Sequence, residues 1–337
     1  MSTSGYHRLV EVASQLTDDT DVLDGLDELT PVDAELILQR WEPIFQACEE
    51  ILCEECEVPL RYEADFFSYH TQEVQHLRNL SRAIDFAGHG ARLRGDDHQT
   101  VRHGLANLEL GNAVRRGGLV VDHLVSVAIA QMGIDLLRRS RDRYDDTICK
   151  RITDALQKHE TGREPFATIL QRDSRWENES GYFDSSYAKS QINFDEFIDP
   201  DSELSVEEQR ELIQLFKDLA RRPLSERYEQ YLAQDRQLVA LPRLLVVDLA
   251  IRQFQYRKGR LPESLAQLSP EVLEWIPRDP FSDDQFIYRP NNPCFVVYSP
   301  GPDRRDAGGK FGPWPAVCFD GCDLCLDAND YWDDYCK

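Results

Sequence analysis

Proline is distributed unevenly along this chain, and the distribution limits what each part can form. Ten of the 17 prolines follow Gly259, from Pro262 to Pro315. A long helix cannot run through such a region, because proline lacks an N–H and clashes with the preceding turn. Before Gly259, apolar residues recur at helical spacing. We therefore predict an α+β fold: a predominantly α-helical bundle or helical-hairpin region over 1–236, then a small helix-plus-antiparallel-sheet module over 237–337.

The helical region is expected to contain several consecutive helices. Thr30 and Pro31 fit an N-cap and first position of a helix that ends before Pro59, with a break or kink at Pro43. A further helix is predicted over 119–144. Residues 172–203 are expected to form an ordered but irregular connection with room for one short helix. Ser205 and Glu208 predict a capped helix over 205–220.

A helical hairpin is predicted within 73–116, where two apolar patterns flank Gly95 and Asp96. The stretch ARLRGDDHQTVRHGLANLELGNAVRR resembles one unit of a tetratricopeptide-type repeat, with small residues where the helices approach. The sequence contains no second copy at the repeat period. An ordinary antiparallel helical bundle is therefore the alternative.

The C-terminal module is expected to hold a short helix near 263–268 and two strands, over 286–289 and 295–299. Prolines and asparagines between the strands indicate a hairpin turn. Because an isolated hairpin is marginally stable, it should pack on the preceding helix over 244–256. That helix is expected to end at Gly259.

The chain is strongly acidic, with 61 Asp and Glu against 38 Lys and Arg and a formal net charge of −23. Such a charge repels phosphates and anionic lipid surfaces, so we expect no nucleic-acid partner. The charge either serves solubility or attracts a basic protein partner.

The sequence predicts a cytoplasmic location and no membrane span. The N-terminus lacks the basic start and apolar stretch of a secretory signal. The most apolar internal segment, 124–134, is too short to span a bilayer and predicts a buried helix.

Three motifs in the C-terminal region resemble the globular domain of type II secretion major pseudopilins. They are YRKGRLPESLAQL, IPRDPFSDDQFIYR and FVVYSPGPDRRDAGG, and they occur within 249–309 in that family's order. This sequence differs from the pseudopilin family ahead of these motifs, because it lacks the very hydrophobic N-terminal helix through which pseudopilins assemble. The whole chain looks like bacterial proteins of no assigned role that carry a helical region ahead of such a tail.

The pseudopilin resemblance implies a calcium loop after the second strand. Carried over residue by residue, Ser299 opens the loop, Asp303 matches its aspartate, and Asp306 stands where a further acidic ligand could serve. Calcium takes six to eight oxygens, so Asp320 or Asp323 would have to contribute. The family's adjoining acidic pair is replaced here by Phe-Gly-Pro-Trp after Lys310. The alternative is a turn in which Asp303 bonds its own backbone.

The tail carries four cysteines in a C-x3-C-x2-C-x10-C pattern. They are Cys318, Cys322, Cys325 and Cys336. Four thiolates are the number that a structural zinc ion requires, although two tight pairs would be the usual spacing. Disulfides and free thiols are the alternatives, and free thiols are expected in a cytoplasmic protein.

The functional prediction rests mainly on the enzyme motifs that this sequence lacks. The sequence contains no GxxxxGK[ST], GxGxxG, HExxH or GxSxG motif. We expect a noncatalytic protein-interaction or scaffold protein. One alternative is a calcium or zinc module with a structural or secretion-related role. A further alternative is a metal-dependent enzyme on the histidine-rich helices, which would require His76, His103 or His123 to converge with carboxylates.

Overall fold

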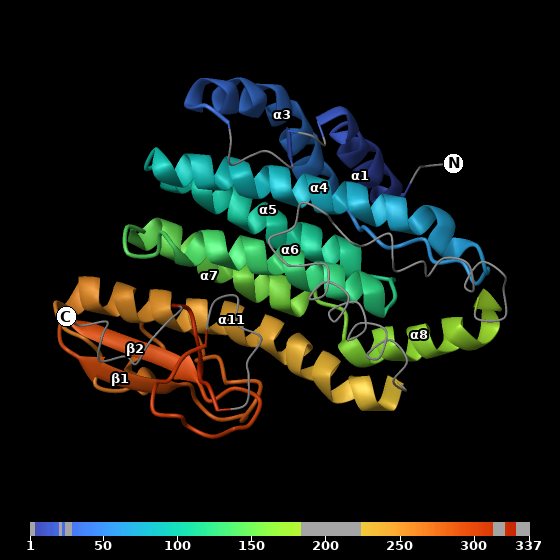
Figure 1. Ribbon diagram of the computed structural model, residues 1–337. Coiled ribbons are helices and arrows are strands. Elements are labelled where there is room, and N and C mark those ends of the chain that lie inside the picture. Colours follow the sequence, from blue (N-terminus) through green and yellow to red (C-terminus); the bar gives the residue numbers. More distant parts are fainter. Residues whose placement is uncertain (1–3, 20–21, 24–28, 183–223, 313–320, 328–337) are drawn as a thin grey trace, which may run out of the picture.

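The structure is a computed structural model, which describes residues 4–19, 22–23, 29–182, 224–312 and 321–327 (Figure 1). The predicted α+β class is confirmed, since helices dominate and a small antiparallel sheet lies near the C-terminus. The α-helices are α1 (Gly5–Ser14), α3 (Pro31–Leu52), α4 (Phe66–Leu93), α5 (Asp97–Arg115), α6 (Val120–Arg138), α7 (Asp146–Thr161), α8 (Phe166–Glu179) and α11 (Leu224–Lys258). The short elements are the 3-10 helices η1 (Thr17–Asp19) and η5 (Leu265–Leu268) and the strands β1 (Ile287–Asn291), β2 (Cys294–Ser299) and β3 (Leu324–Cys325).

The elements form successive layers, which Figure 1 shows from top to bottom. Helices α1 and α3 contact each other, and both contact α4. Helix α4 packs on α5 and α6, and α5 in turn contacts α7. Helix α11 contacts α6 and α7 on one side and β2 on the other. It therefore joins the helical region to the sheet.

The helices predicted on either side of Gly95 are α4 and α5. Gly95 has a φ of +75°, in the left-handed region that favours glycine. Asp96 caps α5 by accepting a hydrogen bond from the backbone N–H of Gln99 at 3.0 Å. The turn chemistry seen in the sequence therefore reverses the chain here.

Helices α5 and α6 approach closely through two glycines. A Cβ built on Gly133 would lie 2.6 Å from the backbone oxygen of Gly104, and one on Gly104 would lie 2.8 Å from the side chain of Leu137. The backbone of the facing helix cannot move aside locally, so larger residues would separate the two helices.

Helix α6 contains the segment predicted to be a buried helix. Among the described helices, it alone has the length and apolar composition of a membrane span, with 56% of its most apolar 18-residue window buried inside the protein. The helix ends at Arg138 rather than at residue 144, because the chain turns there toward α7.

Two helices contain an internal proline, so the chain does not break at Pro43, where the sequence predicts a break or kink. Helix α3 continues through Pro43, and α11 continues through Pro242 as one helix. The residues that flank Pro43, Trp41 and Ile44, are buried, and Leu241 beside Pro242 is buried as well. Burial of these side chains offsets the hydrogen bond that each proline removes.

The connection predicted over 172–203 starts later than expected, because α8 runs to Glu179. Trp176 is buried and donates its indole N–H to the backbone oxygen of Arg61 at 2.8 Å. Asp173 accepts a hydrogen bond from the backbone N–H of Val120 at 2.9 Å, at the start of α6. Contacts far along the chain thus hold a helix that local composition disfavours. Residues 183–223, which include the helix predicted over 205–220, lie outside the described residues.

The C-terminal sheet has the order β1-β2-β3, and both pairings are antiparallel. Asn291 pairs with Cys294 across a two-residue turn, which places the predicted hairpin one or two residues from its expected bounds. The short helix expected near 263–268 is the 3-10 helix η5. The sequence did not indicate β3, which returns from residue 324 to pair with β2.

The main core surrounds α11. Leu244, Val247 and Ile251 are buried together with residues of α5, α6 and α7, and the same cluster includes Val297 of β2. The predicted packing of the hairpin on this helix is therefore present. Because this part of α11 is buried on nearly every side, it needs cover from both the helices and the sheet.

A buried ionic cluster joins α4 to the start of α6. The ring of His70, which is 1% exposed, lies 2.7 Å from Asp122 and 3.1 Å from Glu73. Asp122 also accepts a hydrogen bond from the backbone N–H of Leu119 at 2.7 Å, which caps α6. Burial by itself would lower the pKa of His70, but its bonds and charge interactions with Asp122 and Glu73 outweigh burial and raise the pKa to about 9.

We predict that the free energy of unfolding falls as the pH rises from 6.5 to about 9, because the unfolded chain releases the His70 proton near 6.5 and the folded chain holds it. The stabilisation is complete below pH 6.5, and at ~1.4 kcal/mol per unit the loss above it is about 3 kcal/mol. Urea unfolding at several pH values measures this change in the free energy of unfolding. His70→Gln should remove this fall, whereas His98→Gln, at an exposed histidine, should retain it. Equal slopes in His70→Gln and wild type would contradict the assignment.

Candidate functional site

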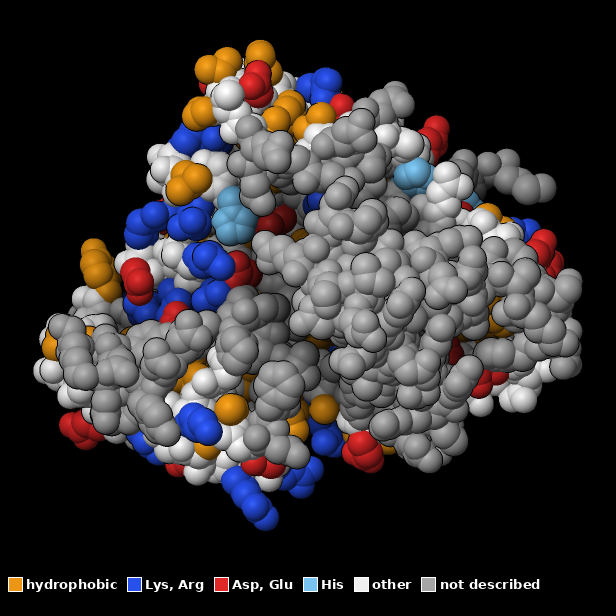
Figure 2. Space-filling view, in the orientation of Figure 1, with side chains coloured by type: hydrophobic (Ala, Val, Ile, Leu, Met, Phe, Trp, Pro, Cys, Tyr) orange, Lys and Arg blue, Asp and Glu red, His pale blue; other side chains and the backbone are white. Residues whose placement is uncertain are grey.

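Two adjoining cavities lie where the α6–α7 turn faces α11 and the sheet. Their volumes are 620 Å³ and 500 Å³, and they share Arg141, Asp142, Arg252 and Gln255. We call them together the arginine cleft. Figure 2 shows blue and red side chains close together on the left of the visible face, between the helices above and the sheet below.

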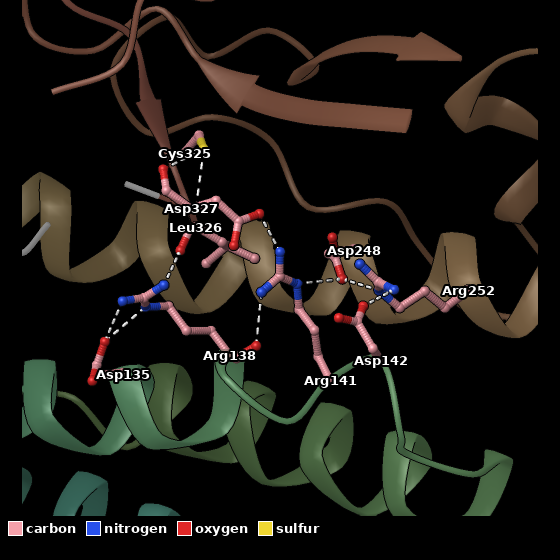
Figure 3. A network of polar contacts seen from close by, with 9 residues as sticks. All are labelled: Asp135, Arg138, Arg141, Asp142, Asp248, Arg252, Cys325, Leu326 and Asp327. Atoms are coloured by element: carbon pink, nitrogen blue, oxygen red, sulfur yellow. Dashed lines mark hydrogen bonds and ion pairs between the residues drawn. The ribbon is translucent and has the colours of Figure 1, made fainter. Parts of the chain in front are cut away.

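Three arginines hold the cleft together from different elements (Figure 3). Arg138, at the end of α6, donates to the backbone oxygen of Leu326 at 2.8 Å. Arg141, in the following turn, donates to the backbone oxygen of Arg138 at 2.7 Å and to the carboxylate of Asp327. Both arginines therefore bind the segment that continues from β3.

Asp248 of α11 is the centre of this network. It is 4% exposed, accepts a hydrogen bond from Arg252 at 2.6 Å, and lies 3.2 Å from the Nε of Arg141. Arg252 also bonds Asp142 and stacks over the ring of Phe295 in β2, at 5.2 Å from its centroid. One buried carboxylate thus connects the α6–α7 turn with the helix that carries the sheet.

Charge pairing explains how these groups tolerate burial. Burial by itself would lower the pKa of Arg141, but Asp248 and Asp327 outweigh it and raise that pKa. The arginines are matched by carboxylates, since Asp135 bonds Arg138 and Arg139. The buried part of the cleft therefore has little net charge, and its arginines each bond a carboxylate of the chain, although the Nε of Arg141 lies 3.2 Å from Asp248 without a hydrogen bond. Its chemistry suits holding the C-terminal module in place rather than binding a free anion.

The outer rim of the cleft has a different character. Tyr256 of α11 is 85% exposed although it lines the larger cavity. Asp142 lies on the same rim with 74% of its side chain exposed. Asp145 and Asp146 at the start of α7 are exposed as well. The rim therefore presents an aromatic face beside several carboxylates.

Sequence reasoning missed this site, although two signals for it exist. Asp248 interrupts the apolar run LLVVDLAI, and an acidic residue within a buried helix requires a partner. The run RRSRDRYDD, from Arg138 to Asp146, supplies alternating charges directly after an apolar helix. Neither signal says which carboxylate meets which arginine.

The side chains of the predicted calcium loop bond to the protein itself. Ser299 donates its hydroxyl to Asp279 at 3.0 Å. Asp303 accepts hydrogen bonds from two backbone N–H groups at 2.9 and 3.1 Å. Asp306 accepts from the hydroxyl of Tyr298 and the guanidinium of Arg289, each at 2.9 Å.

The remaining acidic residues near this loop do not complete a cation site among the described residues. Asp323 accepts from the backbone N–H groups of Ala307 and Gly309 at 3.0 and 2.7 Å, and Asp320 lies outside the described residues. These oxygens face protein donors and an arginine, so the arrangement does not favour calcium. Calcium binding stays a prediction, which elemental analysis of the purified protein can test.

The cysteines of the predicted zinc site are described only in part. Cys318 and Cys336 lie outside the described residues, and Cys322 is half-buried. Cys325 is buried, its thiol donates to the backbone oxygen of Asp327 at 2.9 Å, and burial raises its pKa. Zinc requires thiolates, and a raised pKa opposes their formation. Zinc binding likewise stays a prediction.

The three histidines considered for a metal-dependent enzyme occupy separate environments. His76 lies 3.5 Å from the hydroxyl of Thr17, and His103 meets the ring of Phe45 edge-on at 5.5 Å. His123 accepts a hydrogen bond from Arg115 at 2.6 Å, and burial lowers its pKa to about 3. Among the described residues, no group of three or more His, Cys, Asp or Glu is arranged to hold a metal ion.

No protein-family model, curated protein or solved structure matches this chain. The pseudopilin resemblance of the C-terminal module therefore stays a prediction. The functional argument rests on the geometry of the described residues.

We predict that Asp248→Asn destabilises the protein by about 3 kcal/mol, because it leaves buried Arg141 and half-buried Arg252 without their shared counter-charge. Urea unfolding at neutral pH measures the difference. Asp154→Asn, which breaks an exposed ion pair with Lys150 on α7, should cost less than about 0.5 kcal/mol. A loss below about 1 kcal/mol for Asp248→Asn would contradict a central role for this carboxylate.

Proposed function

We propose that this protein is a noncatalytic interaction protein whose arginine cleft holds a basic segment of a partner protein at its outer rim. One observation carries the proposal: Tyr256 is 85% exposed at the mouth of a 620 Å³ cavity whose exposed rim carries three carboxylates and one guanidinium, that of Arg143, which Asp97 already binds. Tyrosine and arginine are the residues most enriched in the energetically important parts of protein interfaces.

The rim can attract a cation in two ways. The open face of Tyr256 can receive a guanidinium or ammonium group by a cation–π contact. The carboxylate of Asp142 bonds Arg252 on one side, and its exposure leaves acceptor positions open to a second donor. A partner arginine placed between Tyr256 and Asp142 could make both contacts.

The charge of the whole chain favours the same kind of partner. A formal charge of −23 creates a field that draws basic proteins and repels acidic ones. The arginines of the cleft do not reverse this preference, because carboxylates of the same chain occupy them. A basic segment is therefore favoured both at long range and at the rim.

The cavity chemistry supports binding rather than catalysis. The thiol among the described residues that line the larger cavity belongs to Cys149, and burial raises its pKa to about 12. A protonated thiol is a poor nucleophile. The described residues that line either cavity include no histidine that could act as a base.

We predict that a fluorescent Arg-Gly repeat peptide binds the full chain, whereas a matched Glu-Gly peptide does not. Tyr256→Ala should weaken binding at least about tenfold, because truncating a central aromatic side chain typically costs more than 1 kcal/mol. Fluorescence anisotropy at two salt concentrations measures the affinity and its electrostatic part.

Trp275→Ala is the matched control, because Trp275 is also exposed, at 49%, but does not line the cleft. It should bind the Arg-Gly peptide as the wild type does. Equal losses in Trp275→Ala and Tyr256→Ala, or equal binding of the acidic peptide, would overturn the proposal.

A further inference from the structure

The smaller cavity of the arginine cleft is bounded on one side by strand β2. Four consecutive residues of the strand, 294–297, line this 500 Å³ cavity. Successive side chains of a strand point to opposite faces, so side chains alone cannot bring four consecutive residues to one cavity. The strand therefore presents its edge, with backbone N–H and C=O groups, to this space.

Strand β3 covers only one end of that edge. It pairs with β2 at Tyr298 and Ser299, and it ends at Cys325. Among the described residues, no strand pairs with Phe295 on the side away from β1. Unpaired backbone groups at the edge of a sheet are a template for another strand.

A proline shows which backbone groups of β2 face the cavity. Pro290 of β1 pairs with Phe295 and has no N–H to donate. In an antiparallel pair of strands, hydrogen-bonded residue pairs alternate with pairs that exchange no backbone hydrogen bond. Pro290 and Phe295 belong to the second kind, so the N–H and C=O of Phe295 point away from β1. The next residue, Val296, pairs with Arg289 and points its own backbone groups toward β1.

The charges around this edge favour one kind of segment. Asp142 lines both cavities, with 74% of its side chain exposed. The arginines that line the smaller cavity each bond a carboxylate of the same chain; they are Arg138, Arg139, Arg141 and Arg252. A second copy of this protein carries the same formal charge of −23 and is repelled. A basic segment of another protein is therefore the favoured occupant.

We propose that the basic segment bound at the arginine cleft is an extended strand, which adds to the edge of β2 beside β3 and pairs its backbone with Phe295. This inference rests on the proposed function, because it specifies how the same partner binds. In strand addition, main-chain hydrogen bonds supply affinity and alternate side chains supply specificity. Four residues of such a strand span about 13 Å, which matches the four residues of β2 at the cavity. A basic side chain of the strand bonds Asp142, which lines the same cavity.

Two N-methylated isomers of a fluorescent Arg-Val-Arg-Val-Arg-Val peptide test this pairing with the full chain. One isomer carries its methyl groups on the valine nitrogens, and the other carries them on the arginine nitrogens. Alternate N–H groups of a strand point to opposite sides, so only one row can bond β2. By fluorescence anisotropy, one isomer should bind at least about tenfold more weakly than the unmodified peptide, and the other should bind within about threefold of it. Equal affinity of the two isomers would overturn the strand addition.

Amide hydrogen exchange of β2 gives a second readout. The amide of Phe295 should exchange rapidly in the free chain and at least about tenfold more slowly with the unmodified peptide bound. The amide of Val296, which points toward β1, is the internal control and should be protected in both states. A Phe295 amide that is already protected in the free chain, or that the peptide leaves unchanged, would contradict the proposal.

Two further outcomes separate this inference from its alternatives. Sedimentation of the free chain as a dimer, together with a protected Phe295 amide, would assign the edge to a second copy. Binding of the Arg-Gly peptide that depends on Tyr256, without any effect of N-methylation or any protection of Phe295, would refute strand addition and leave the proposed function in place.

Discussion

The central part of helix α11, residues 238–251, imposes the main constraint on this structure, because a helical segment that is apolar on nearly all sides cannot leave a face in water. Its residues Leu244, Val247 and Ile251 are fully buried. The helical layer of α6 and α7 covers one side, and β2 covers another. A two-stranded hairpin has marginal stability by itself, because it cannot bury its apolar face. The helix and the sheet therefore each cover apolar surface of the other. The two parts of the chain thus share one core, although their secondary structures differ.

Paired charges fix the elements that this apolar core brings together. Hydrophobic contact is non-directional and does not specify register, whereas an ion pair requires a defined geometry. His70 and Asp122 set α4 against the start of α6. Asp248 and Arg141 set α11 against the α6–α7 turn in the same way, at the opposite end of α6. Each pair is buried, so each contributes only while both partners are charged.

The proposed binding of a basic segment follows from where charged and aromatic side chains stay exposed. Inside the arginine cleft, carboxylates of the chain pair with its arginines, and the groups that a partner can reach lie at the rim, where Tyr256 and Asp142 are exposed. The acidic exterior suits this rim to a cation.

The sequence by itself determined the kinds of elements and their order. Helical spacing, capping residues, the Gly95 turn and the prolines after Gly259 act over a few neighbouring residues, so they can be read without knowledge of the fold. Tertiary structure decided the helical state of residues 172–179, where Trp176 reaches Arg61, and the existence of β3. It also decided the arginine cleft, where Arg141 meets Asp327 across 186 positions of sequence. Local patterns carry no information about such distant partners, because burial and charge pairing are settled only when the whole core closes.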